Sequence, residues 1–154
     1  MIYDATAEHL REVVELGQQY FDKSRFAQFQ AYNETQAHNY FRTAIISPMC
    51  KADVLLIDNH VVGFCVTIAG PQGWSSNLAA NVNLLYIEEE HRGGGWERVF
   101  VERAEQWAQQ NNMDEILLGD YGMTPERTKI LTERMGYETV GYIGCKRLNV
   151  DQAA

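Results

Sequence analysis

Hydrophobic positions change their spacing from segment to segment along the chain, and these changes predict alternating strands and helices. Residues 1–4 are typical of a short strand, and Thr6 can cap the helix that follows. The apolar positions of this helix recur every three or four residues. They are Leu10, Val13, Val14, Gly17, Tyr20 and Phe21. Residues 22–32 are polar and aromatic without a clear period, so we expect a loop there with at most a short helix.

A second helix is predicted to begin at Asn33, because Gln36 follows three residues later in a capping-box arrangement. Pro48 lies just past its end. Its apolar face consists of Tyr40, Phe41, Ala44 and Ile45.

A hairpin follows, with strands at 54–57 and 61–69 and tight-turn residues Asp58 and Asn59 between them. Residues 70–80 are expected to form a loop. Residues 82–87 then form a further strand, in which Asn83 is the one polar interruption.

The second half of the chain alternates helices and strands. Three glycines at 93–95 precede a helix with an apolar face of Trp96, Val99, Phe100, Ala104, Trp107 and Ala108. Residues 115–119 read as a strand. Thr124 and Pro125 begin a helix that ends at Gly136. Residues 140–148, which include Gly141 and Gly144, are predicted to form a last strand.

This order of elements mixes hairpins with strand–helix–strand crossovers. It predicts a mixed α/β (α+β) fold, with a central mixed twisted sheet of six to seven strands and about four helices on its faces. A chain of 154 residues fits one domain. We assign residues 1–149 to this domain and residues 150–154 to a frayed tail.

Composition supports a soluble globular protein. Hydrophobic residues make up 45% and charged residues 22%, which is enough to build a core. The sequence contains no run of 18 apolar residues, so no membrane span is predicted, and the N-terminal residues do not resemble a signal peptide. Three cysteines without CxxC spacing suggest reduced thiols and a cytoplasmic location. Cys65, within an apolar run, is interpreted as a small buried hydrophobe and not as a nucleophile.

Charge narrows the classes of partner. The formal net charge is −8, which argues against a general nucleic-acid binder, because that function needs a basic surface. An acidic surface would suit a cationic amine through electrostatic steering, and it equally suits plain solubility. No cluster of Cys, His and carboxylate residues has the spacing of metal ligands.

The glycine turn is the segment that carries chemistry. A strand runs into Arg92 and glycines 93–95 and then directly into a helix. Glycines allow a sharp turn and a close approach to a ligand, and the helix start adds N–H donors and a positive dipole end. The combination suits a pyrophosphate, although a tight structural turn would look the same. It matches the GxGxxG dinucleotide fingerprint poorly.

The segment Leu85-Tyr86-Ile87-Glu88-Glu89-Glu90-His91-Arg92-Gly93-Gly94-Gly95-Trp96 resembles the acetyl-CoA segment of the GNAT superfamily of N-acetyltransferases. That segment ends a strand and then reads Arg/Gln-x-x-Gly-x-Gly/Ala, of which Arg92 and Gly95 match the first two fixed positions. Residues 124–137 resemble the family's later helix, which ends in a Gly-aromatic pair. The chain also resembles the small GNAT-like proteins often encoded by tailed bacteriophages.

The resemblance implies that acetyl-CoA (or CoA) lies in a V-shaped opening between residues 82–88 and 115–119. It implies that an amine of a small molecule or protein attacks the thioester directly. The acidic charge and the lack of a long apolar run argue against a nucleic-acid or membrane partner. The implied cofactor-binding residues are Leu85, Tyr86, Ile87, Arg92, Gly93, Gly94, Gly95, Trp96, Glu97, Arg98 and Thr124.

The sequence departs from the family at four positions, one of which is Val82, where some relatives have a glutamate that acts as a base. Glu97 replaces a Gly or Ala, Thr124 replaces an asparagine that contacts the cofactor, and Thr132 replaces a tyrosine that protonates the leaving thiolate. Other acid–base candidates are Tyr86, Glu88, Asp120 and Tyr121, which lie on or after the two strands of the opening. The alternative is a catalytically silent GNAT-like domain that acts as a structural or interaction protein, as a homodimer or with a virion or host protein.

Overall fold

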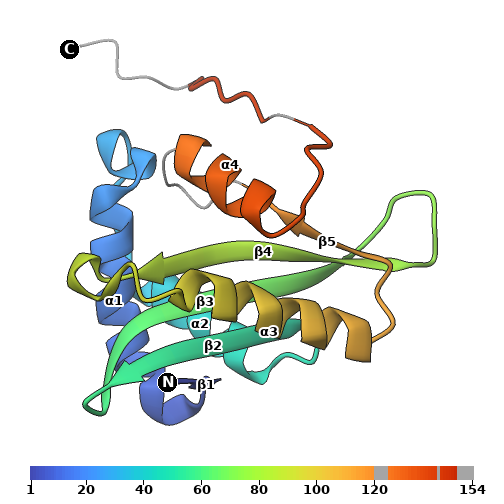
Figure 1. The fold of residues 1–154 in the computed structure, drawn as a ribbon. Helices are drawn as coiled ribbons and strands as arrows, with labels where there is room; N and C mark the ends of the chain where they lie inside the picture. Colours follow the sequence, from blue (N-terminus) through green and yellow to red (C-terminus); the bar gives the residue numbers. More distant parts are fainter. Residues whose placement is uncertain (120–124, 142, 149–154) are drawn as a thin grey trace.

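The fold in Figure 1 is a computed structural model of the chain, and it describes residues 1–119, 125–141 and 143–148. Three single 3₁₀ turns, η1 (Ala7–His9), η2 (Arg25–Gln28) and η3 (Glu89–His91), accompany the main elements. In chain order, these are β1 (Ile2–Asp4), α1 (Leu10–Lys23), α2 (Glu34–Ile46), β2 (Cys50–Ile57), β3 (His60–Pro71), β4 (Leu78–Ile87), α3 (Trp96–Gln110), β5 (Glu115–Leu118) and α4 (Pro125–Arg134). Within the described residues, no helix is both long and apolar enough to cross a membrane.

Local sequence signals explain where these elements begin. The Asn33 side chain accepts a hydrogen bond of 3.0 Å from the Gln36 N–H, which caps α2 as predicted. Asp58 and Asn59 both have positive φ, at 51° and 64°, as the tight turn between β2 and β3 requires. At the first helix, Thr6 starts the turn η1, and α1 follows from Leu10.

The strands form one mixed sheet in the order β1-β2-β3-β4-β5. The first four are antiparallel neighbours, and β5 pairs with β4 in parallel. This last pairing runs from Ala79 opposite Glu115 to Val82 opposite Leu118, and β4 continues to Ile87 without β5 beside it. The strands predicted at 82–87 and 115–119 are therefore parallel neighbours, and their pairing ends at Val82 opposite Leu118.

The prediction of six to seven strands is wrong, because the sheet has five. The described part of residues 140–148 forms no strand, and Val140, Ile143 and Leu148 are exposed. Two glycines weaken this segment as a strand, and no neighbour among the described residues pairs with it. The predicted 70–80 loop is also too long. β3 extends to Pro71 and β4 starts at Leu78, so the loop is residues 72–77.

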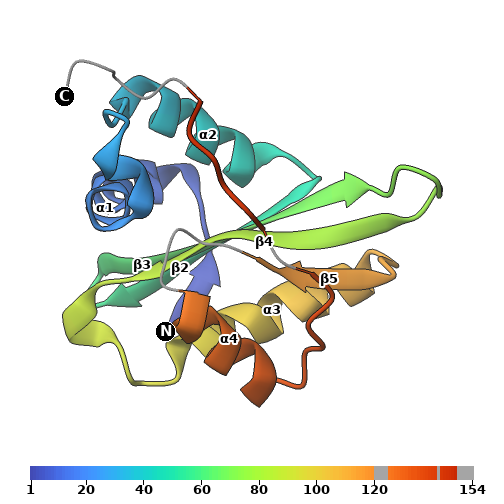
Figure 2. The same ribbon diagram turned by 90° about the horizontal axis from the view of Figure 1, so that it is seen from above.

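Helices cover both faces of the sheet, as Figure 2 shows: α1 and α2 pack on one face, and α3 and α4 on the other. The four α-helices found in residues 1–119, 125–141 and 143–148 agree with the predicted number of about four. Each face has its own core, and β4 contributes to both, because its residues alternate from Leu84 to Ile87, beyond an irregularity in its pairing with β3. Leu85 and Ile87 belong to the core under α3, and Leu84 and Tyr86 to the core under α1 and α2.

A buried ion network fixes α3 to the strands beneath it. The Asp53 carboxylate on β2 is 2% exposed and accepts hydrogen bonds from Arg103 of α3 at 2.8 Å. Lys51 lies 3.2 Å from the same carboxylate. Arg103 also bonds Asp4 of β1 at 2.6 Å, and Lys51 bonds Asp4 as well. The Lys51 hydrogen bond is the main reason why the pKa of Asp4 lies below its ordinary value.

Candidate functional site

The turn between β4 and α3 has the backbone that its glycines allow. Gly93 and Gly95 have φ values of +88° and +78°, in the left-handed region, and Gly95 is the residue before α3. Nothing lies within 4 Å of the Cβ that either would carry, so the space beside them is open. Gly94 differs, because a Cβ there would lie 2.8 Å from Nε1 of Trp96. The Trp96 ring therefore packs against Gly94 and not into that space.

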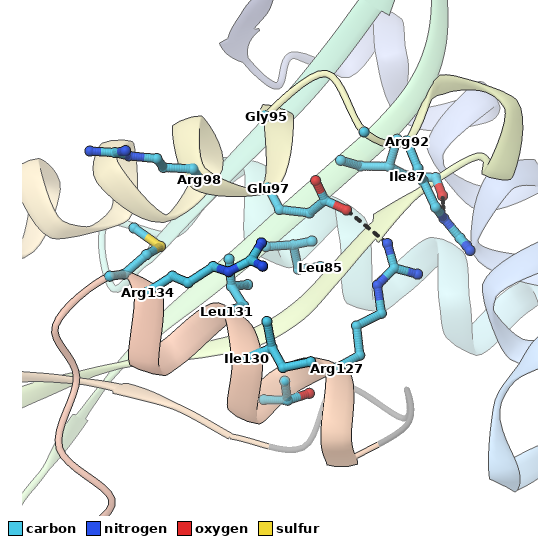
Figure 3. A pocket seen from close by; sticks show the side chains of 13 residues that line it. Leu85, Ile87, Arg92, Gly95, Glu97, Arg98, Arg127, Ile130, Leu131 and Arg134 are labelled. Carbon is cyan, nitrogen blue, oxygen red and sulfur yellow. Dashed lines mark hydrogen bonds and ion pairs between the residues drawn. The ribbon is translucent and has the colours of Figure 1, made fainter.

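A cleft of about 410 Å³ opens beside this turn, between the end of β4, the start of α3 and the length of α4. Figure 3 shows it from close by. We call it the arginine cleft. It is lined by Leu85, Ile87, Arg92, Gly93, Gly95, Glu97, Arg98, Arg127, Thr128, Ile130, Leu131, Arg134 and Met135.

Four arginines and one carboxylate give the cleft its charge. Arg92 donates from Nε to the Ile87 carbonyl at 2.8 Å, and its guanidinium lies 5.5 Å from the Tyr86 ring centre. Arg98 pairs with Glu102 at 2.7 Å and points away from the cleft along α3 (Figure 3). Arg134 has no ion-pair partner among the described residues. Even without Arg98, the lining of the cleft holds more arginines than carboxylates, in a chain whose net charge is −8.

One ion pair crosses the cleft. Arg127 of α4 donates to the Glu97 carboxylate of α3 at 3.0 Å, and their side chains are 44% and 21% exposed. Figure 3 shows the two side chains meeting between the helices. The carboxylate belongs to the first turn of α3, where N–H groups without intrahelical partners and the helix dipole favour negative charge.

Apolar side chains form the wall behind the arginines. Leu85 and Ile87 come from β4, Ile130 and Leu131 come from α4, and Met135 follows α4 directly. Beyond Val82, the edge of β4 that faces this side is not paired with β5. The cleft therefore combines an open strand edge, an apolar wall and cations at a helix start. Such a combination suits a ligand that has both an apolar part and an anionic part.

The structure brings most of the predicted cofactor residues to this cleft. Those that line it are Leu85, Ile87, Arg92, Gly93, Gly95, Glu97 and Arg98. Tyr86, Gly94 and Trp96 are not among its lining residues, because Tyr86 points to the opposite face and the other two pack against each other. Thr124 lies outside the described residues. That these residues bind a cofactor stays a prediction.

The predicted catalytic residues lie apart. The Tyr86 side chain is 1% exposed, its ring packs against Tyr20 and Phe64, and its hydroxyl has no hydrogen-bond partner among the described residues. Glu88 follows β4, accepts a hydrogen bond from Gln19 of α1 at 3.3 Å and lies 3.8 Å from His91. Asp120 and Tyr121 fall outside the described residues.

Thr132, at the position of the expected tyrosine, has its hydroxyl engaged by the helix itself. Its Oγ1 donates to the Lys129 carbonyl at 2.8 Å, a common bond for threonine within a helix. The hydroxyl is therefore committed to α4, and Thr132 is not a lining residue of the cleft.

Sequence reasoning missed the contribution of α4. Arg127 and Arg134 are seven residues apart, so they lie on one face of the helix, with Ile130 and Leu131 between them. The seven-residue spacing of the two arginines could have indicated a cationic face on α4 from the sequence alone. A second missed contact is the hydrogen bond of 2.6 Å from the Asn83 side chain to the Tyr40 hydroxyl, one residue beyond the last β4–β5 pair.

Two other features could carry chemistry: the thiol of Cys65, and a cluster of two carboxylates and a histidine after β4. Burial raises the pKa of Cys65 to about 12, so its thiol stays protonated near neutral pH and is a poor nucleophile. Possible ligand atoms of Glu88, Glu90 and His91 lie within 4.8 Å of one another in the turn after β4, which the sequence analysis did not anticipate. The Glu90 side chain is exposed, and such acidic groups are common without a metal.

No protein-family model matches the chain, and no curated protein matches it in sequence. Solved structures do match. The chain is similar to a ribosomal-protein-alanine N-acetyltransferase from Brucella melitensis biovar Abortus 2308, with a TM-score of 0.72, 18% identity, and coverage of 96% of this chain and 99% of that one.

Two further structures are aminoglycoside acetyltransferases. One, an aminoglycoside antibiotic 6′-N-acetyltransferase from Acinetobacter haemolyticus, has a TM-score of 0.73 and 14% identity over 98% of this chain and 99% of that one. The other, an aminoglycoside N-acetyltransferase in complex with CoA, has a TM-score of 0.75 and 13% identity over 97% of this chain and 95% of that one. At these identities, the likeness shows that the chain has the GNAT-like fold.

Proposed function

We propose that this chain is an acetyl-CoA-dependent N-acetyltransferase that acts on an amine of a small molecule or a protein. The observation that carries the proposal is the arginine cleft, where four arginines meet an apolar wall at a strand–glycine–helix turn in a chain of net charge −8. An acidic protein that gathers cations in one concave site has a site suited to an anionic ligand. The fold shared with acetyltransferases identifies CoA as the anion to test first.

The residues that would hold CoA follow from the geometry of the cleft. The N–H groups at the start of α3, with Arg92, Arg127 and Arg134, would take the phosphates. The open edge of β4 at 85–87 would pair with the amide groups of the pantetheine arm. When bound, acetyl-CoA supplies an activated acetyl group as a thioester. The chain's own task is to orient the amine and to stabilise the carbonyl oxygen with backbone N–H groups.

Proton transfer would fall to acidic or phenolic residues that follow the two strands in sequence. Asp120 and Tyr121 come after β5 and Gly119, and Glu88 follows β4, so these three stay our candidates. Tyr86 is a weaker candidate, because its hydroxyl is buried on the face away from the cleft. Thr132 is excluded from the role by its bond to the Lys129 carbonyl and by its weak acidity.

The acceptor is proposed as a class only. The similar structures include a ribosomal-protein-alanine N-acetyltransferase and an aminoglycoside 6′-N-acetyltransferase, so both kinds of amine are suitable probes. The negative net charge would favour the approach of either cationic acceptor. A bacteriophage source and a cytoplasmic location stay predictions from the sequence.

The alternative is a GNAT-like domain without catalysis, and one observation favours it. Glu97 occupies the start of α3 with a carboxylate that already satisfies Arg127. Such a domain would serve as a structural or interaction protein. The two functions differ in whether bound acetyl-CoA is turned over.

Calorimetric titration with acetyl-CoA at low ionic strength tests the proposal. We expect measurable binding that weakens as salt is added, because phosphate contacts are screened. Arg134→Ala should weaken binding about tenfold, the loss of roughly one charge-assisted contact. Arg11→Ala is the matched control, since it removes one cation from the exposed surface of α1 and should leave binding unchanged.

Absence of binding at millimolar acetyl-CoA would contradict the proposal. A second step follows thiol release in the presence of an aminoglycoside or a peptide that begins with alanine. Thiol release that depends on the amine supports the acetyltransferase, and tight binding with no release for either acceptor supports the silent domain.

A further inference from the structure

The ion pair across the arginine cleft has the form of a ligand contact. A phosphate bound at the start of α3 would meet N–H groups from the first turn of that helix and a guanidinium from α4. In the free protein, the Glu97 carboxylate, on the first turn of α3, accepts the hydrogen bond of the Arg127 guanidinium that a phosphate there would use. Its side chain is only 21% exposed, so it lies within the cleft and not on the outer surface.

We propose that Glu97 is a built-in competitor for the ligand's diphosphate, and that Arg127 exchanges the carboxylate for a phosphate when the ligand binds. The inference rests on the proposed function. It assigns Arg127 as a phosphate-binding residue and Glu97 as the residue that sets the affinity. The proposal differs from simple repulsion between Glu97 and the ligand, because the two anions share one cation.

Other pairs on α3 do not have this geometry. Arg98 and Glu102 are four residues apart on the same helix. Their ion pair therefore does not span the cleft, and it does not compete with a ligand for a cation there. The Glu97–Arg127 pair instead joins two helices on opposite sides of the cleft. A ligand between these helices must either separate the pair or pass around it.

Charge is the property to vary. Glu97→Gln keeps the shape and removes the charge, so the side chain no longer competes strongly for Arg127. We expect it to bind CoA about tenfold more tightly than the parent at low ionic strength, and the gain should largely disappear at 1 M salt, where the screening length is about 3 Å. Glu102→Gln removes the same charge from the same helix, and it should change affinity less than about twofold.

A double-mutant cycle separates exchange from repulsion. In the parent, Arg127→Ala has two opposite effects on CoA affinity. It lowers the affinity by removing a phosphate contact, and it raises the affinity by removing the ion pair that binding must break, so the net loss is small. In the Glu97→Gln background nothing cancels. The loss caused by Arg127→Ala should therefore be larger there, by about threefold or more. Equal losses in the two backgrounds would mean that Glu97 and Arg127 act independently, and the exchange would be wrong.

Ligand fragments identify the group that is exchanged. The gain of Glu97→Gln should persist with dephospho-CoA, which keeps the diphosphate, and should vanish with pantetheine, which has no phosphate. A gain lost with dephospho-CoA, or kept with pantetheine, overturns the assignment to the diphosphate. If parent and Glu97→Gln bind CoA with the same measurable affinity, only this inference fails. If neither binds at millimolar concentration, the proposed function fails with it.

Discussion

The two faces of β4 are made by alternating residues of one strand, yet one face is sealed and the other is open. Tyr86 points to the side of α1 and α2, where the rings of Tyr20, Phe41 and Phe64 stack edge to face in a closed core. Leu85 and Ile87 point to the side of α3 and α4 and line the arginine cleft. A shift of one residue along the strand thus separates a purely structural environment from a site that can hold a ligand.

The difference explains why the two faces use different interactions. The sealed face gains stability from aromatic burial, which needs no partner from outside. The open face instead places arginines of the β4–α3 turn and of α4 around a concave surface, an arrangement that becomes favourable when an anion fills it. Binding sites are often built in this way, at the expense of some stability.

The largest expected effect comes from opening the sealed face. Phe64 is 1% exposed and contacts three other rings, so Phe64→Ala should lower the free energy of unfolding by about 3–5 kcal/mol. Ile130 is its counterpart on the open face and is 50% exposed. Ile130→Ala should change stability by less than about 0.5 kcal/mol and should weaken acetyl-CoA binding.

Urea unfolding and calorimetric titration of both variants check this pair of outcomes. The comparison between the faces breaks down if Ile130→Ala unfolds the protein as readily as Phe64→Ala does. It also breaks down if Ile130→Ala binds acetyl-CoA as the parent does.

The next effect concerns how the open face is fixed to the sheet. Asp53 joins α3 to β2 through Arg103, and it is almost fully buried. Asp53→Ala leaves Arg103 and Lys51 with only the exposed Asp4 as partner, and we expect it to lower the free energy of unfolding by about 3 kcal/mol.

Glu102→Ala is the control for Asp53→Ala, because it breaks an exposed ion pair on the same helix. It should change stability by less than about 1 kcal/mol. Thermal unfolding of the two variants compares them directly, and similar shifts would show that the Asp53 network is no more important than a surface pair.

The smallest expected change in the free energy of unfolding comes from removing the hydroxyl of either of two tyrosines in the core under α1 and α2. The buried Tyr86 hydroxyl has no hydrogen-bond partner among the described residues, so Tyr86→Phe should be neutral or stabilise by less than about 1 kcal/mol. Tyr40→Phe removes the bond to Asn83 and should destabilise by about 1 kcal/mol. If Tyr86→Phe lowers acetyl transfer more than tenfold without a change in acetyl-CoA affinity, Tyr86 takes part in the reaction after all.

Much of the fold follows from local chemistry that the sequence displays. The cap at Asn33, the turn at Asp58 and Asn59 and the glycine turn before α3 need no distant partner, so their positions could be predicted. The strand predicted at 140–148 depends on a neighbour with which to pair, and an apolar run does not show whether that neighbour is available. Its glycines lowered the strand propensity further, and its apolar side chains are exposed.

Only the part of the site that lies in one continuous segment could be predicted from the sequence. The β4–α3 turn is contiguous, so one segment revealed Arg92 and Gly95. Arg127 and Arg134 reach the same cleft from a helix that follows another strand, and only the packing of α4 against β4 and α3 brings them there. The Glu97–Arg127 pair joins positions 30 residues apart, and nothing in either local segment predicts it.

The order of the strands also has a consequence for how the molecule folds. β2, β3 and β4 form a meander of neighbouring hairpins, whose short connections close quickly. β5 reaches β4 only after the chain has passed through α3, and the loss of chain entropy on closing that loop precedes the contacts that compensate for it. The arginine cleft needs α4 as well, which comes later still. We therefore expect the cleft to assemble in the final step of folding. CoA present during refolding should then change the rate of this last step and leave the rate at which the meander forms unchanged.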